Sequence, residues 1–238
     1  ADVGVVGECE DVLVELAGLT SRDTQLASVV WLNEAGELAG RAEKHATDVK
    51  TLPALRWPAA LLRRHTHHHH RFDERPDGPG GEVEASRGCP YHCTFCAKDN
   101  FRDAFRKRPL DVVLSEVDDL VAKGVRYVYF IDEIFVPDVK LLEGLRERAV
   151  VFGVQMRIDN WTPPMLDLLG EAGCVSIEAG MESITEVGRS LLAKRCKLST
   201  DELTELLIHA KKRVPFVQAN LLDATCDKKV DVERWRKR

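Results

Sequence analysis

Residues 87–98 read Arg-Gly-Cys-Pro-Tyr-His-Cys-Thr-Phe-Cys-Ala-Lys, and this run carries the clearest signal in the chain. Its cysteines, Cys89, Cys93 and Cys96, follow the spacing C-x3-C-x2-C, with the aromatic Phe95 directly before the third. Thiolates are the ligands that iron–sulfur clusters prefer, and three of them can hold three corners of a [4Fe–4S] cluster. A structural cluster or zinc site uses four protein ligands, so three leave one iron open to a small molecule. The spacing therefore favours an enzyme.

The run resembles the signature of the radical S-adenosylmethionine (SAM) enzymes, in which C-x3-C-x-aromatic-C follows the first strand of the core. The resemblance implies that the open iron binds the amino and carboxylate groups of SAM. It implies that an electron from the cluster cleaves SAM to methionine and a 5′-deoxyadenosyl radical. It also implies a small-molecule substrate and an electron donor such as flavodoxin or ferredoxin.

A zinc site is the alternative that the spacing leaves open. The three cysteines could combine with His92, or with a histidine from positions 67–70, in a Cys3His zinc site. Residues 82–86 lead into the run like a strand, and a regular alternation of helix and strand follows it. Zinc ribbons lack such an alternation, so the iron–sulfur interpretation is favoured.

Composition sets the broad class of the protein. The chain has 238 residues, enough for one large domain or one domain with an appendage. Its 44% hydrophobic and 31% charged residues are typical of a soluble globular protein. The net charge of −5 predicts no general attraction to nucleic acid or membranes. No apolar run approaches the ~18 residues of a membrane span, and no signal peptide is visible.

Cysteine usage and the chain ends give two further expectations. Seven cysteines is an odd number and three have metal-site spacing, which favours a reducing cytoplasm over a disulfide framework. Cys174 lies in an apolar run and is expected in the core. The chain opens on Ala1 rather than Met and closes on Arg-Lys-Arg, so we interpret it as a fragment of a longer protein.

Apolar strands alternate with amphipathic helices from residue 82 onward. Such alternation predicts βα units, a parallel sheet and right-handed crossovers. We therefore expect an α/β fold, a partial (β/α) barrel with about five of the six units of the radical SAM type, incomplete at its C-terminal end. The expected strands are 82–87, 125–131, 150–156, 174–177 and 214–219, and the expected helices begin at Pro109, Pro137, Pro163 and the capping box Ser199–Glu202.

The first 60 residues read as a separate αβ segment, with a strand at 2–6, a helix at 11–18 and a hairpin at 27–39. They resemble the end of a cobalamin-binding domain, whose late strand ends in a pair like Gly7-Glu8. The part of that domain that would carry the motif D-x-H-x-x-G is absent. The alternative is a generic extension that covers the core. We thus divide the chain into a cobalamin-binding-like remnant (1–60), a His-rich connector (61–81) and a core (82–238).

The connector contains His65-Thr-His-His-His-His70, five histidines in six residues that can bind a transition metal.

Polar residues follow each predicted strand, where parallel α/β folds form their active sites. The candidates at these positions are Asp132 and Glu133, Arg157, then Glu178, Gly180, Glu182 and Ser183, and finally Asn220. The structural alternative for each acid is a helix cap or a helix-dipole partner.

The resemblance gives these candidates cofactor-binding roles. Asp132 or Glu133 matches the acidic position that meets the ammonium group of SAM, although Ile-Asp-Glu replaces the more usual Gly-Gly-Glu. Glu178 matches a residue that binds the ribose hydroxyls or the amino-acid part of SAM. Gly180 allows close backbone approach, and Glu182-Ser183 resembles the Gly-x-Glu-Ser motif. Phe95 and Asn220 would lie near the adenine.

The basic run Arg102, Arg106, Lys107 and Arg108 is interpreted as surface salt pairing, since aromatic interleaving for base stacking is sparse. Nucleic acid is therefore not the expected partner. Three functions remain open: a cobalamin-dependent radical SAM enzyme, either a methyltransferase or one that makes another radical modification of a small metabolite; a radical SAM enzyme without cobalamin; and a non-catalytic zinc- or cluster-binding module.

Overall fold

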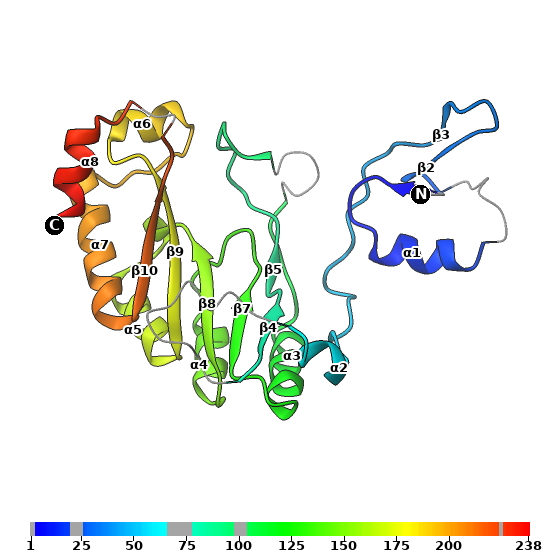
Figure 1. Cartoon of the computed structure of the whole chain (residues 1–238), viewed down its shortest axis with the longest axis horizontal. Helices are drawn as coiled ribbons and strands as arrows, with labels where there is room; N and C mark the ends of the chain where they lie inside the picture. The colour runs from blue at the N-terminus through cyan, green and yellow to red at the C-terminus, as the bar shows by residue number, and fades with distance from the viewer. Residues whose placement is uncertain (1–2, 20–25, 66–77, 98–103, 224–225) are drawn as a thin grey trace.

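The computed structural model describes residues 3–19, 26–65, 78–97, 104–223 and 226–238. Its centre is a five-stranded parallel sheet in which spatial order follows chain order, so every crossover joins neighbouring strands (Figure 1). This arrangement confirms the predicted α/β fold and partial barrel. From one edge to the other the strands are β4 (Gly80–Val83), β7 (Tyr127–Phe130), β8 (Val151–Met156), β9 (Cys174–Glu182) and β10 (Phe216–Leu221).

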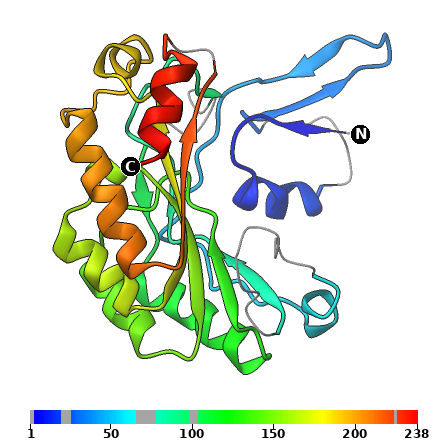
Figure 2. The same ribbon diagram turned by 60° about the vertical axis from the view of Figure 1, so that its left-hand side comes forward.

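Helices cover one face of this sheet (Figure 2). Strand side chains such as Phe130, Val154 and Ile177 face the helices and are fully buried in a single apolar core. The opposite face is polar, because the alternating positions carry Gln155, Glu178 and their neighbours along the sheet. The covering helices are α3 (Leu110–Ala122), α4 (Val139–Arg146), α5 (Pro163–Glu171) and α7 (Thr200–Arg213).

The helix signals in the sequence act as expected. Ser199 and Glu202 form a reciprocal capping box at the start of α7, with the Ser199 backbone N–H donating to Glu202 Oε2 at 2.7 Å. Pro163 is the first residue of α5. Cys174 is buried in the core as predicted, and burial raises the pKa of its thiol to about 12. Two shorter helices, α6 (Glu186–Leu191) and α8 (Lys229–Arg236), and a 3-10 helix, Ile158–Asn160, complete this part.

The N-terminal segment forms its own small antiparallel sheet. Its strands are β1 (Gly4–Val5), β2 (Val29–Leu32) and β3 (Leu38–Gly40), in the order β1-β2-β3, and α1 (Glu10–Ala17) follows β1. The predicted hairpin is therefore confirmed. The division of the chain at residues 60 and 81 stays a prediction.

Residues 53–55, which lead from this sheet toward the barrel, are anchored on α3. The Leu55 backbone N–H donates to Glu116 Oε1 at 2.6 Å, and the same oxygen pairs with Arg108 Nη2 at 2.6 Å. Arg108 Nη2 also donates to the Pro53 carbonyl at 3.2 Å. The buried Arg108–Glu116 ion pair thus holds residues 53–55 shortly before α2 (Ala59–Leu62).

The prediction for the first strand is wrong, and the prediction for the basic run is wrong for Arg106 and Arg108, whereas Lys107 forms a surface ion pair with Asp138 at 2.7 Å. The expected strand 82–87 ends at Val83, and the chain then forms β5 (Ser86–Arg87), which pairs antiparallel with β6 (Arg106–Lys107). The chain leaves the sheet here because Asp132 captures the backbone N–H of Ala85 at 2.9 Å. Arg106 and Arg108 are not surface salt pairs, because both bind buried carboxylates.

Strands β9 and β10 extend further than the sequence indicated. Because β9 runs to residue 182 instead of 177, Glu178, Gly180 and Glu182 lie within the strand and not after it. Asn220 lies within β10 for the same reason. The role of the histidine run cannot be compared with the fold, since only His65 of that run is among the described residues. Arg102 also lies outside them. No helix in the described ranges is long and apolar enough to span a membrane.

Candidate functional site

The three signature cysteines lie on one loop beside the carboxyl ends of the parallel strands. We call residues 88–97 the cysteine loop; it follows β5 directly. Cys89 and Cys93 are half-buried and Cys96 is exposed. All seven cysteines are among the described residues, and none forms a disulfide.

Two neighbouring parts of the barrel hold the backbone of the cysteine loop. The Gly88 N–H donates to Glu133 Oε2 at 2.8 Å, directly before the first cysteine. The Thr94 N–H, directly after the second cysteine, donates to the Leu192 carbonyl at the end of α6, at 3.1 Å. The loop is therefore fixed to the segments that follow β7 and β9.

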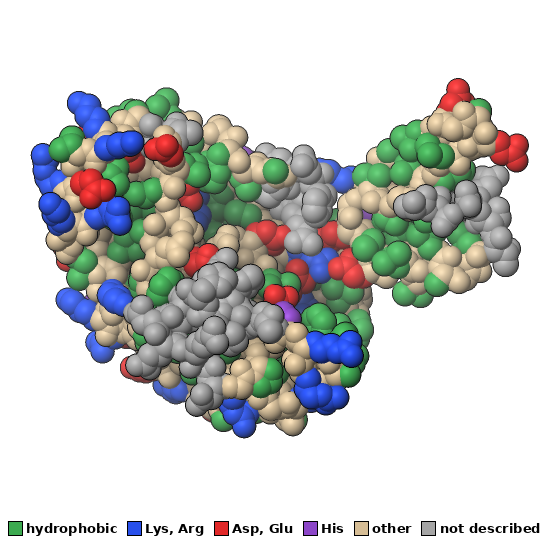
Figure 3. Space-filling model, viewed as in Figure 1, with side chains coloured by type: hydrophobic (Ala, Val, Ile, Leu, Met, Phe, Trp, Pro, Cys, Tyr) green, Lys and Arg blue, Asp and Glu red, His purple; other side chains and the backbone are tan. Residues whose placement is uncertain are grey.

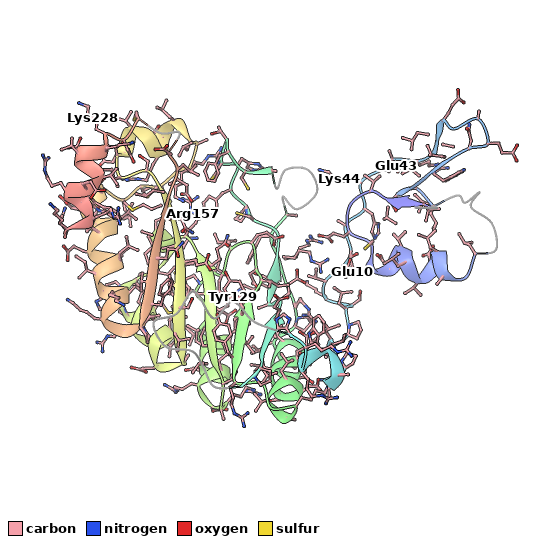
Figure 4. The ribbon with its side chains drawn as sticks, viewed as in Figure 1. Glu10, Glu43, Lys44, Tyr129, Arg157 and Lys228 are labelled. Atoms are coloured by element: carbon pink, nitrogen blue, oxygen red, sulfur yellow. The ribbon has the colours of Figure 1, made fainter. Side chains whose placement is uncertain are left out.

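A third anchor comes from the end of β8. The Tyr91 hydroxyl donates to Asn160 Oδ1 at 2.7 Å, and the guanidinium carbon of Arg157 lies 3.7 Å from the centre of the Tyr91 ring. Figure 4 labels Arg157 near the upper end of the strands in that view. Tyr91 stands between Cys89 and Cys93, so this stack positions both cysteines.

Arg157 keeps one donor available in this buried setting. Its side chain is 8% exposed and pairs with Asp159 at 2.7 Å. Its Nη1 has no hydrogen-bond partner among the described residues. Burial raises the pKa of the neighbouring Cys93 thiol, while the positive charges of Arg157 and Lys194 act in the opposite direction. A buried cation with a spare donor beside a thiol is suited to an anionic ligand.

The structure separates the two acids that the sequence left as alternatives. Asp132 is 4% exposed and accepts hydrogen bonds from the Ala85 N–H and the Ser86 hydroxyl. Burial raises its pKa to about 7. Glu133 instead bonds Gly88, next to Cys89. Asp132 shapes the root of the cysteine loop, whereas Glu133 reaches the loop itself.

The candidates on β9 have different surroundings. Glu178 is 8% exposed on the polar face, where the Tyr129 hydroxyl donates to its Oε1 at 3.3 Å. A Cβ on Gly180 would lie 2.7 Å from Glu182 Oε1, so the chain's own carboxylate fills the space above this glycine. Glu182 has a φ of +62° and forms an ion pair with Lys194.

The remaining candidates lie apart from these anchors or are more exposed. Ser183 is fully buried and donates to Asp227 Oδ1 at 2.7 Å, and the Ile184 N–H donates to Asp227 Oδ2, which ties the end of β9 to the segment before α8. Asn220 accepts from Gln218 at 2.6 Å on β10. Phe95 is 45% exposed at the tip of the cysteine run.

The cysteine loop fits a thiolate-ligated cluster by the chemistry of its donors. It offers three thiols on one loop, two of them close enough for the charge of Cys89 to affect Cys93. Among the described residues no group of three or more His, Cys, Asp or Glu side chains is gathered at metal-binding distances. The three cysteines are thus suitable ligands by type and by their place on one loop, and their thiols are not gathered around one point in this structure.

Sequence reasoning missed Tyr91, Asn160 and Lys194. Tyr91 lies inside the cysteine run and Asn160 follows β8 closely, so their positions were visible although their contact was not. The sequence around Lys194 gives no sign of its role, because its partner Glu182 lies on the other side of α6 in the chain and the two meet only in the folded protein.

Comparisons with known proteins agree with this geometry. The family model described as the radical SAM superfamily matches residues 83–223, which is more than half of the chain.

Among curated proteins, the ribosomal protein uS12 methylthiotransferase RimO of a Nitratiruptor species is 23% identical over 158 residues, 59% of this chain and 35% of that protein. An uncharacterised methyltransferase of Pyrococcus horikoshii is 24% identical over 194 residues, 76% of this chain and 40% of that protein. A tRNA-2-methylthio-N(6)-dimethylallyladenosine synthase of Pseudomonas syringae is 44% identical over 59 residues, 25% of this chain and 13% of that protein.

Two solved structures share the fold over nearly the whole chain. The radical SAM methyltransferase TsrM from Kitasatospora setae, with tryptophan and a SAM analogue bound, matches with a TM-score of 0.74 and 17% identity, covering 99% of this chain and 49% of that one. The cobalamin-dependent SAM radical enzyme OxsB, with aqua-cobalamin bound, matches with a TM-score of 0.70 and 18% identity. The match covers 92% of this chain and 33% of that one. The chain spans about a third to a half of the length of these longer matches.

Proposed function

The chain belongs to the radical SAM superfamily, and from this we propose that Cys89, Cys93 and Cys96 bind a [4Fe–4S] cluster with SAM beside it. Membership makes the chain part of an enzyme and implies the cluster and SAM as cofactors. The observation that carries the residue assignment is the position of the cysteine loop. Three segments that follow parallel strands hold it at the edge where such folds form their active sites.

When bound, the cluster would supply the electron for the reductive cleavage of SAM to methionine and a 5′-deoxyadenosyl radical. The protein's part is to place SAM and to exclude water around it.

We assign the contacts to the charged ends of SAM from the surroundings of each side chain. Glu133 is favoured over Asp132 for the ammonium group, because Asp132 is engaged with residues 85 and 86. The spare Nη1 of Arg157 suits the carboxylate.

Other polar groups would meet the nucleoside. Glu178, presented on the polar face beside Tyr129, suits the ribose hydroxyls. Phe95 and Asn220 are assigned to the adenine. Gly180, Glu182 and Ser183 support these residues through the Glu182–Lys194 and Ser183–Asp227 contacts and do not need to touch SAM.

Cobalamin-dependent methyl transfer is the reaction we favour for the whole protein. Its support is that the matches to TsrM and OxsB extend over the N-terminal segment as well as the barrel. A radical SAM reaction without cobalamin is the second candidate, supported by the matches to methylthiotransferases. A small-molecule substrate and an electron donor of the flavodoxin or ferredoxin type are part of the proposal; a ribosomal protein or a tRNA is the alternative substrate class suggested by the names of those relatives.

The test is anaerobic reconstitution with iron and sulfide, followed by measurement of iron per chain. Cys89→Ala, Cys93→Ala and Cys96→Ala should each prevent stable incorporation, while Cys174→Ala, in the core, should retain it. Adding SAM to the reduced protein should change its EPR spectrum. Full iron incorporation in the triple variant, or stoichiometric zinc with no effect of SAM, would overturn the proposal.

A further inference from the structure

Two arginines face each other at the base of the cysteine loop. In the antiparallel β5–β6 pair, Arg87 stands directly opposite Arg106, and the loop with its three cysteines extends beyond them. Like charges that face each other across a strand pair are destabilising. Without compensation, this pair would tend to open at the point where the loop begins.

One buried carboxylate from the N-terminal segment pairs with Arg106 and also lies beside Arg87. Glu8 is 4% exposed; its Oε1 accepts from Arg106 Nη2 at 2.5 Å and its Oε2 accepts from Arg106 Nη1 at 2.8 Å. Glu8 Oε2 also lies 3.5 Å from Arg87 Nη1. Burial opposes ionisation of Glu8, but hydrogen bonds and charge from Arg106 and Arg87 lower its pKa below the ordinary value. Glu8 is therefore ionised where the two arginines meet.

The local chain geometry directs Glu8 to this position. Gly7 has a φ of +100°, and a Cβ there would lie 2.3 Å from the His45 carbonyl oxygen, so only glycine allows this close approach. The Glu8 N–H then donates to that carbonyl at 3.0 Å, and the Thr47 N–H donates to Glu8 Oε2 at 2.8 Å. Contacts within the N-terminal segment therefore fix the Glu8 carboxylate in the orientation in which it pairs with the arginines.

Two neighbouring acids, Glu84 and Glu10, pair with Arg87 and not with Arg106. Glu84 binds Arg87 through two hydrogen bonds of 2.9 and 2.8 Å, and Glu10 Oε1 lies 2.7 Å from Arg87 Nη1. Arg106 has no other carboxylate partner among the described residues apart from Glu8. Figure 3 shows acidic and basic side chains gathered where the N-terminal segment meets the barrel, and Figure 4 labels Glu10 at this junction.

We propose that Glu8 is a positioning residue for the cluster: by neutralising Arg106, which faces an Arg87 already paired with Glu84 and Glu10, it keeps the base of the cysteine loop closed. This inference rests on the proposed function of the three cysteines. The N-terminal segment is then more than a cover for the barrel. Any movement of residues 1–49 that withdraws Glu8 loosens the loop that carries the ligands, so the state of that segment is coupled to the cluster.

The test compares four variants of the full chain with the wild type after anaerobic reconstitution. Glu8→Gln keeps the shape but removes the charge, and Glu8→Gln with Arg106→Gln also removes one of the opposed charges. Arg106→Lys keeps the charge but cannot hold both carboxylate oxygens in one plane. Glu37→Gln is the control, because Glu37 loses the same charge on the exposed turn between β2 and β3, where among the described residues its carboxylate accepts from Asn33.

The readouts are iron per chain, the rate of iron transfer to an external chelator, and the EPR spectrum of the reduced protein with SAM. Glu8→Gln should transfer iron about tenfold faster than the wild type, as expected for removing one member of a buried charged network. The double variant should transfer iron more slowly than Glu8→Gln, because one of the two opposed positive charges is gone. Arg106→Lys should give an intermediate rate of iron transfer and an altered EPR spectrum, and Glu37→Gln should match the wild type.

Two results would overturn the inference. One is a folded Glu8→Gln protein, judged by circular dichroism, that transfers iron at the wild-type rate. The other is a double variant that transfers iron as fast as Glu8→Gln does. If Glu8→Gln does not fold, Arg106→Lys decides: a wild-type rate and spectrum reject the inference. A wild-type protein that takes up no iron would instead reject the proposed function.

Discussion

Arg157 lies over the ring of Tyr91, with its guanidinium carbon 3.7 Å from the ring centre. The same tyrosine donates its hydroxyl hydrogen to Asn160, so one side chain between two cysteines is held by both its face and its tip. This contact fixes the cysteine loop to the end of β8.

Tyr91→Phe should therefore weaken the attachment modestly, and Tyr91→Leu should weaken it more. The first removes a hydrogen bond of about 0.5–1.5 kcal/mol, and the second also removes a cation–π contact of about 0.5–2 kcal/mol. The measurement is the free energy of unfolding in denaturant, together with iron retention. Equal effects of the two substitutions would show that the Arg157 stack contributes nothing.

Glu178→Ala should reduce SAM affinity by about 1–3 kcal/mol, the usual loss when a buried hydrogen-bonding partner of a ligand is removed. Calorimetric titration of the reconstituted protein with SAM measures this. Glu205→Ala, on the exposed side of α7, serves as the control. Unchanged affinity in Glu178→Ala would remove this residue from the SAM site.

Asp132→Asn should change how stability depends on pH. The folded-state pKa of Asp132 is raised to about 7 from an ordinary value of 3.8, so the native state holds this proton more tightly than the unfolded state. Its stabilising contribution is complete below about pH 4 and is lost as pH rises through 7, by at most about 1.4 kcal/mol per pH unit. Asparagine can accept from Ala85 and donate to Ser86 at every pH, so the variant should lack this decline.

Denaturant unfolding at pH 5 and pH 8 tests the point. The wild type should lose more stability than Asp132→Asn between these values. Parallel behaviour of the two proteins would mean that Asp132 is already ionised at pH 5.

Hydroxocobalamin should bind these 238 residues weakly. Over the described residues 3–19 and 26–65 the N-terminal sheet has three short antiparallel strands, and His45 is engaged with Asp11 at 2.8 Å. Equilibrium dialysis measures the affinity. Tight binding would contradict the expectation and make His65 and the following histidines the first residues to substitute.

Much of the fold was readable from local patterns. Helix and strand periodicity, prolines at helix starts and the Ser199–Glu202 box each act within a few residues, so sequence alone located nearly every element of the barrel. The same holds for the cysteine spacing, because the three cysteines share one short stretch of chain wherever that stretch lies. Fold class and family followed from these short-range signals.

Contacts between distant segments were beyond such reasoning. The choice between Asp132 and Glu133 depended on which of them reaches Ala85 and which reaches Gly88, more than 40 residues earlier in the chain. Arg106 looked like a surface cation because Glu8, its partner, is 98 residues away. Burial and charge pairing are properties of the assembled molecule: a side chain's environment is set by whatever the folded chain brings against it, and that information is absent from its sequence neighbours.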